Sequence, residues 1–252
     1  MGNPQEQVEF RPIKEGPFNF GCHKDILCFT QCCARLRLIL TPYDIVRIKK
    51  RLGLPSDEFL EKYTETVIDR QHRFPLVKLK MNEPPEEDCP FVTKEGCTIY
   101  EDRPEACRLY PVGRASAMPN GAPASNETFF MVVEPHCQGF KEKQLWTLDE
   151  WLNHEGVSEY AAVNEPWRGI VTSTKSLGSE AHIPQKHQMF FMASYNLDKF
   201  REFIFKSRFF DRLQVDSIMK DRLKTDDVTL MRFAFDWLRF SLFGERTINI
   251  KE

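Results

Sequence analysis

The sequence predicts a mainly α-helical fold with minor β-structure, in which an irregular, loop-rich cysteine domain forms the N-terminal half and packs on C-terminal helices. Three observations predict this fold. All eight cysteines lie between Cys22 and Cys137, strong helix start signals recur along the chain, and phenylalanine is concentrated after Gln188, where apolar residues recur at helical spacing. We expect two domains: a cysteine-cluster domain over residues 1–145, organised by metal, and a helical C-terminal extension over residues 146–252.

The N-terminal half is predicted to contain little regular structure apart from two helices and short strands. Residues 1–21 contain three prolines, which break helices, so we expect them to be extended and irregular. The run 22–33 is too polar and too rich in cysteine for an amphipathic element, and we place it on a loop that leads into a helical turn. Alternating apolar residues predict short strands over 74–82 and 128–133, whereas 89–111 has the character of a loop.

Three helix starts stand out in the sequence. Thr41 followed by Pro42 and an early aspartate supplies an N-cap, a proline at the first helical position and an acidic side chain in the first turn, and the helix should stop at Gly53. A second helix should start at Ser56. Thr147 with a glutamate three residues on fits a capping box and predicts a third helix.

The C-terminal region is predicted to be helical after a linker. Residues 164–187 contain proline, glycine, serine and threonine and are interpreted as a linker or surface loop. A long helical pattern covers 189–205, with an interruption near Asn196. Another helix should run over 226–243 and end at Gly244.

Composition restricts the classes of function. The 35 basic side chains nearly balance the 37 acidic ones, so there is no global positive field to attract nucleic acid. No stretch approaches the roughly 18 consecutive apolar residues that span a membrane, and the N-terminus lacks the apolar run of a signal peptide. We therefore expect a cytoplasmic protein without a membrane or nucleic-acid partner, although a protein partner is compatible with the sequence. The oligomeric state is left open.

In a reducing compartment, a dense set of cysteines is more often metal-binding or catalytic than a framework of disulfides. We therefore interpret all eight as candidate ligands of iron–sulfur or zinc, with iron–sulfur preferred: Cys22, Cys28, Cys32, Cys33, Cys89, Cys97, Cys107 and Cys137. Cys28 and Cys32 lie four residues apart and share one face of a helical turn, whereas the adjacent Cys33 points elsewhere. This favours two four-thiolate centres, or one centre with supporting cysteines. The spacing matches neither a ferredoxin run nor a zinc ribbon.

Other polar residues lie beside the cysteines. Arg103 and Arg108 flank Cys107, and we expect such cations, Arg108 before the others, to offset the negative charge of a thiolate centre. His23 and His136 each adjoin a cysteine, but with eight thiols available a ligand role for either is unnecessary. No catalytic residue and no cofactor-binding loop can be assigned from the sequence.

Several segments resemble the YkgJ-type cysteine-cluster family, the zinc- or iron-chelating domain named for its CxxCxxCC motif. The resemblance rests on FNFGC ending at Cys22, on Cys28 with the Cys32–Cys33 pair, on LTPYDIVRIKKRLG, and on CPF followed by CTIYEDRPEACRLYP. It covers roughly residues 18–140. The gaps between the first cysteines are longer than the family name implies.

The resemblance extends more distantly to flagellin lysine N-methylase, which shares the cysteine domain and is thought to bind an iron–sulfur cluster. The sequence as a whole leaves several candidate functions. The leading one is a metal-binding protein of unassigned activity that carries an iron–sulfur cluster or zinc, and a redox role comes second. The alternatives are an S-adenosylmethionine-dependent enzyme similar to a protein lysine N-methylase and a zinc-stabilised protein-interaction module, so whether the chain is an enzyme is left open.

Overall fold

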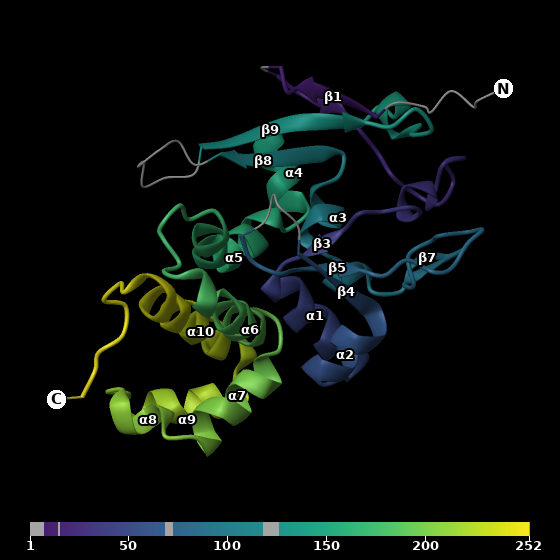
Figure 1. Cartoon of the computed structure of the whole chain (residues 1–252). Helices are drawn as coiled ribbons and strands as arrows, with labels where there is room; N and C mark the ends of the chain where they lie inside the picture. The colour runs from purple at the N-terminus through teal and green to yellow at the C-terminus, as the bar shows by residue number, and fades with distance from the viewer. Residues whose placement is uncertain (1–7, 15, 69–72, 118–125, 252) are drawn as a thin grey trace. The chain divides into compact units, whose positions relative to one another are not determined.

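The structure is a computed structural model that describes residues 8–14, 16–68, 73–117 and 126–251 (Figure 1). Helices account for 48% and strands for 16% of the chain, which confirms a mainly α-helical fold with minor β-structure. All paired strands among the described residues are antiparallel. No helix in these ranges is both long enough and apolar enough to cross a membrane.

The chain forms two compact units, and each of them is built from two separate segments. Unit 1 consists of Met1–Leu38 and Lys80–Ala161, and unit 2 consists of Ile39–Leu79 and Ala162–Glu252. The N-terminal half is therefore not one compact body, because its segment 39–79 packs with the C-terminal helices. The contiguous domains 1–145 and 146–252 stay a prediction, since compact packing does not show which parts fold independently.

Unit 1 contains small antiparallel sheets. Strands β1 (Glu9–Pro12), β9 (Asn126–Val133) and β8 (Val112–Ala117) form a sheet in the order β1-β9-β8, β2 (Phe18–Asn19) pairs with β10 (Leu145–Trp146), and β6 (Val92–Thr93) pairs with β7 (Gly96–Cys97). The strand predicted over 128–133 is confirmed within β9. The β6–β7 hairpin was expected to be loop; Gly96 permits its tight turn by adopting a φ of +118°, which other residues avoid.

The helices of unit 1 are short. They are the 3-10 helices η1 (Gln31–Cys33), η2 (Tyr100–Asp102) and η3 (Gly139–Lys141) and the α-helices α3 (Glu105–Leu109) and α4 (Leu148–His154). The helical turn predicted at the end of the cysteine loop is η1. The capping box predicted at Thr147 is confirmed, because its N–H donates to Glu150 Oε2 at 2.8 Å and its hydroxyl accepts from the Glu150 N–H at 3.3 Å.

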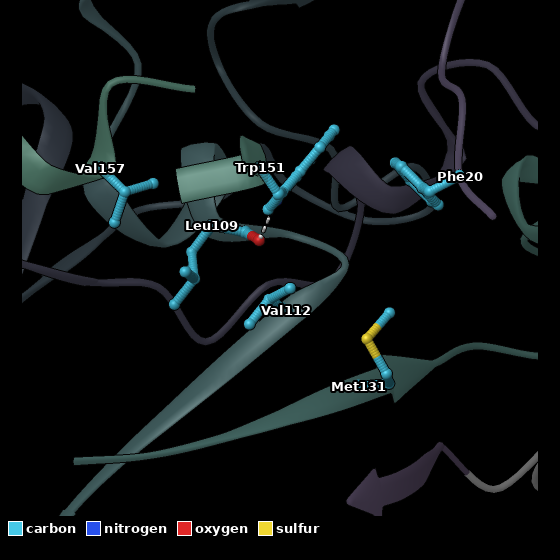
Figure 2. Close-up of a cluster of buried hydrophobic side chains, with 6 residues drawn as sticks. All are labelled: Phe20, Leu109, Val112, Met131, Trp151 and Val157. Atoms are coloured by element: carbon cyan, nitrogen blue, oxygen red, sulfur yellow. Dashed lines mark hydrogen bonds between the residues drawn. The ribbon is translucent and has the colours of Figure 1, made fainter. Parts of the chain in front are cut away.

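The core of unit 1 is a small apolar cluster between sheet β1-β9-β8, α3 and α4 (Figure 2). Its buried members are Phe20, Leu109, Val112, Met131, Trp151 and Val157. Trp151 Nε1 donates to the carbonyl of Leu109 at 3.0 Å, so the indole satisfies its polar atom inside the cluster. Each of these side chains contributes about 1.5–3 kcal/mol when fully buried.

Unit 2 is mainly helical. It contains the sheet β3-β5-β4, formed by β3 (Ile39–Leu40), β5 (Leu76–Leu79) and β4 (Thr64–Val67), and the helices α1 (Pro42–Leu52), α2 (Ser56–Tyr63), α6 (Ile183–Ser194), α7 (Leu197–Lys206), α8 (Phe209–Arg212), α9 (Ser217–Thr225) and α10 (Asp227–Phe243), with the 3-10 helix η4 (Glu180–His182). The helices predicted after Thr41 and up to Gly244 are confirmed at both ends. Asn196 interrupts the long pattern as expected, because its side chain caps α7 by accepting from the Lys199 N–H.

The prediction of a linker over 164–187 is wrong for most of that range. Helix α5 (Val157–Val171) runs through Pro166, and α6 begins at Ile183. A proline inside a helix costs about 3 kcal/mol. Tertiary contacts offset this cost: buried Asn164 accepts from the Tyr43 N–H at 3.3 Å and donates to Thr41 Oγ1 at 3.0 Å, and its neighbours along the helix are also buried.

Candidate metal centre

The loop from Cys22 to Cys33 is a series of turns held against the segment around Gly139. The amide of Gly21 donates to the Gly139 carbonyl at 3.1 Å, which fixes the start of the loop beside η3. Further along, the Gln31 N–H donates to the Cys28 carbonyl at 3.0 Å and opens η1. A loop anchored at one end and wound at the other brings distant cysteines to the same place.

Four of the eight cysteines line one pocket in unit 1: Cys22, Cys28, Cys32 and Cys137. The pocket is also lined by the side chains of Phe20, Ile26, Tyr110 and His136. The enclosed space is about 10 Å³, roughly the volume that a single water molecule requires. The sequence analysis did not predict that three cysteines of the first run and the last cysteine of the chain would line the same pocket.

Partial burial and mutual proximity raise the pKa of two of the pocket thiols, Cys22 and Cys137. Burial first, and then the neighbouring thiols of Cys32, Cys28 and Cys137, together raise the pKa of Cys22 to about 11. The pKa of Cys137 is also raised by burial, although contact with the Tyr110 hydroxyl works in the opposite direction. Ligation requires the thiolate, so a bound cation must supply the charge that replaces these protons.

Backbone amides point at the sulfur atoms of several cysteines. The Gln138 N–H donates to Cys28 Sγ at 3.1 Å. Amides that lie two residues further along the chain bond to the thiols of Cys89, Cys97 and Cys137 and lower their pKa against the larger effect of burial. Amide donors stabilise a thiolate and tune the properties of a thiolate-bound metal, so the backbone around these four cysteines favours charged sulfur.

A second group of cysteines lies around the β6–β7 hairpin. The strand pairing sets Cys97 opposite Val92, and the Val92 amide donates to the Cys89 carbonyl at 3.0 Å. The Cys89 amide in turn donates to the Cys33 carbonyl at 2.8 Å. Burial raises the pKa of Cys89 to about 11, and the nearby thiol of Cys97 adds to the shift.

Cys107 lies on α3, is partly buried and does not line the pocket. The structure therefore brings four predicted ligands together. The Cys89 thiol lies near that of Cys97, whereas the Cys33 thiol contacts the Cys32 thiol, so the expectation that Cys32 and Cys33 point to different places is wrong. Within the described ranges, no three side chains of His, Cys, Asp or Glu stand so that they could hold a single metal ion. The donor chemistry of the pocket fits a thiolate-bound metal, but the side chains are not assembled around one point.

Three polar atoms are buried without an aligned hydrogen bond in the part of the chain that the structure describes: Tyr110 Oη and His136 Nε2 of the pocket lining, and Glu134 Oε2, which does not line the pocket. His136 Nε2 lies 3.6 Å from Glu134 Oε2. Burial, together with contacts to the Cys137 thiol and to Glu134, raises the pKa of Tyr110. Buried polar atoms of this kind require an explanation, and a bound group in the pocket would supply one.

Sequence reasoning did not single out Tyr110 or Glu134. The signal available was that Tyr110 follows Cys107 closely and that Glu134 precedes Cys137 by three residues. Of the two histidines considered, His136 lines the pocket, whereas His23 is exposed and lies 3.5 Å from Glu142.

The buried arginines are held mainly by protein groups. Arg108 donates to the carbonyls of Arg103 at 3.1 Å and Glu155 at 2.9 Å and lies over the Tyr160 ring. Arg108 therefore mainly links backbone segments through hydrogen bonds. Arg103 pairs with buried Glu155, and its charge lowers the pKa of the Cys97 thiol, which burial raises.

Comparison with protein families gives one match. Residues 21–138 match the family model CxxCxxCC, described as "Putative zinc- or iron-chelating domain". Neither a curated protein nor a solved structure matches the chain. The matched range begins one residue before Cys22 and ends one residue after Cys137, so it contains all eight cysteines.

Proposed function

Because residues 21–138 of this chain are a domain of the CxxCxxCC family, we propose that the protein binds metal through the thiolates of the pocket cysteines Cys22, Cys28, Cys32 and Cys137. The observation that carries the proposal is their convergence on one pocket from two segments of chain more than a hundred residues apart. Four soft sulfur donors are the typical ligand set of zinc and of iron–sulfur centres.

The electrostatics of the pocket support ligation. Burial works against charged sulfur, as the raised pKa of Cys22 and Cys137 demonstrates. The Gln138 amide works for it by donating to Cys28. Deprotonation of these thiols is unfavourable without a cation, and amide donors are already in place to stabilise the thiolates. A bound metal therefore stabilises the pocket, and its binding free energy adds to the stability of the fold.

Our preferred occupant is an iron–sulfur cluster. In a four-iron cluster each iron takes one cysteine, so the ligating sulfurs stand further apart than they do around one zinc ion. The eight clustered cysteines are the basis of this preference, and no three described side chains stand around a single ion position. The free space of about 10 Å³ is smaller than a cluster, so binding requires rotation of the lining side chains, of which Cys22 is exposed.

Cys33, Cys89, Cys97 and Cys107 stay predicted ligands of a second centre or supporting thiols of the first. The proximity of the Cys89 and Cys97 thiols supports a second centre for those two, whereas the contact of the Cys33 thiol with Cys32 supports a place for Cys33 in the first. A redox role would follow from a reducible cluster in a cytoplasmic protein. Methyl transfer stays a prediction from family resemblance.

The test is anaerobic purification followed by analysis of iron, zinc and acid-labile sulfide per chain, together with an absorption spectrum. Iron with stoichiometric sulfide and a broad visible absorption band support the proposal in its preferred form. Stoichiometric zinc without colour replaces the cluster by a zinc–thiolate site. A folded protein with neither metal contradicts the proposal.

A further inference from the structure

Unit 2 contains a second cavity that the cysteine chemistry does not involve. Its volume is about 490 Å³, and it lies where α7, α8 and α10 meet the end of the chain. This volume falls within the roughly 300–1,000 Å³ of small-molecule sites.

The walls of the cavity are aromatic and aliphatic. Four rings contribute to them: Phe203, Phe209, Trp237 and Phe240. The ring centroids of Phe203 and Phe209 are 5.6 Å apart, and those of Phe209 and Trp237 are 5.7 Å apart. These rings make much of the lining apolar, so the cavity suits an apolar body.

The C-terminal residues close one side of this hollow. The Gln214 amide donates to the Asn249 carbonyl at 2.9 Å, and the Lys251 amide donates to the Arg212 carbonyl at 3.0 Å. Between these bonds, Leu213 forms a β-bridge with Ile250, and both residues line the cavity. The wall is therefore fixed by backbone hydrogen bonds, which preserve the shape of the cavity.

The polar side of the cavity is positively charged. Arg208 and Arg212 both line it. Arg208 shares its charge with Asp211, whose Oδ2 lies 3.2 Å from Arg208 Nε. In the described part of the chain, the Arg212 guanidinium has neither an ion-pair partner nor a hydrogen-bond partner.

From this combination we propose that the cavity binds a small amphipathic carboxylate, an acyl chain with its apolar body on the four rings and its carboxylate on Arg212. A guanidinium presents paired donors that match the two oxygens of a carboxylate. The apolar walls exclude a purely polar anion, and the positive edge disfavours a neutral hydrocarbon. The assignment is independent of the metal centre, because every residue that carries it belongs to unit 2.

The experiment measures binding of dodecanoate to the full chain by titration calorimetry below its micelle-forming concentration, with 1-dodecanol as the uncharged probe of the same length. We expect dodecanoate to bind with a stoichiometry of one and dodecanol to bind at least tenfold more weakly. Arg212→Gln should weaken dodecanoate binding by about tenfold or more and leave dodecanol binding unchanged, because a charge-assisted hydrogen bond is lost.

The matched control is Arg232→Gln, since Arg232 is exposed on α10 and does not line the cavity. It should bind dodecanoate like the parent chain. Equal binding of acid and alcohol, or an unchanged affinity in Arg212→Gln, overturns the assignment of a carboxylate. Absence of binding by a folded chain overturns the site. Light scattering provides a second check: a dimer whose association constant changes in Trp237→Phe would show that the cavity is covered by a second copy of the chain, which also overturns the site.

Discussion

The two compact units differ in how they are held together. Unit 2 buries whole aromatic rings: Phe59, Phe74, Phe190, Phe200 and Phe235 have no exposed surface. Unit 1 has short helices and strands of two to eight residues around a cluster of six buried side chains. Most of its cysteine-bearing chain is turn and loop. The difference indicates that unit 2 is stabilised by its core, whereas unit 1 needs a further source of free energy.

That source, in our account, is the metal. A structural thiolate–zinc site contributes on the order of 10 kcal/mol to folding. The entropy cost of ordering a loop is about 1–2 kcal/mol for each residue's backbone. The loop from Cys22 to Cys33 has few buried side chains to offset this cost, because Cys28 alone of its twelve residues is buried. Ligation of its cysteines would hold the loop in place.

Removal of metal should therefore produce the largest difference in stability between the two units. We expect chelation under anaerobic conditions to abolish amide-exchange protection around Phe20 and Cys137 and to leave it intact in α10, with a loss on the order of 10 kcal/mol for unit 1. Hydrogen exchange read by mass spectrometry checks this. Protection in unit 1 that survives complete metal removal would show that its apolar cluster is sufficient.

A core substitution should have the complementary effect in unit 2. Phe235→Ala removes a fully buried ring and should lower the free energy of unfolding by about 3–5 kcal/mol. Urea denaturation of the metal-loaded protein measures it, with Ile218→Ala, at a side chain 75% exposed, as the control. A change in Phe235→Ala no larger than in the control would contradict the idea that unit 2 depends on its core.

Breaking a buried ion pair should act on unit 1. Arg103→Met removes the guanidinium partner of the buried Glu155 carboxylate and leaves it only His154 Nδ1, 2.9 Å from Oε1, and we expect a loss of about 3 kcal/mol. Arg35→Met is the matched control, since Arg35 and Glu87 form an exposed pair that contributes about 1 kcal/mol or less. Thermal unfolding of both variants checks the difference; equal melting temperatures would refute it.

The smallest expected effect is a pH dependence in unit 2. Burial raises the pKa of Asp198, but the Ser56 amide and hydroxyl and the Lys49 ammonium outweigh it, so the folded pKa lies below 3.8. Because the folded pKa is lowered, the stabilisation is present above the unfolded pKa and is lost as pH falls through the folded value.

Asp198→Asn should therefore reduce the difference in unfolding free energy between pH 7 and pH 3 by about 1 kcal/mol, a figure already discounted for solvent screening. Urea denaturation at the two pH values measures it. Asp211→Asn, at an exposed carboxylate, is the control and should leave the difference unchanged. The same pH difference in both variants would contradict the assignment.

Features that depend on neighbouring residues could be predicted from the sequence, and features that depend on distant contacts could not. The helix after Thr41 and the helix that ends at Gly244 are confirmed, because their capping chemistry is written in adjacent residues. The part of α5 that passes Pro166 was missed, because contacts of Asn164 with residues far along the chain decide it. The grouping of Cys137 with the first cysteine run was missed for the same reason.

The composition of the candidate site was therefore predictable and its arrangement was not. Eight clustered thiols indicate metal chemistry at the level of residue types, and the family match bears this out. The division between the pocket group and the hairpin group depends on the anchor at Gly21 and on the β6–β7 pairing, neither of which has a local signal in the sequence.

The central claim is that the pocket cysteines hold the metal, and the most direct test is the metal content of two variants purified side by side. Cys28→Ala removes the buried thiol that accepts the Gln138 amide, and Ile26→Ala removes a lining side chain without a donor atom. Our account predicts that Cys28→Ala loses most of its metal and Ile26→Ala retains the parental ratio. A parental metal ratio in folded Cys28→Ala would contradict it.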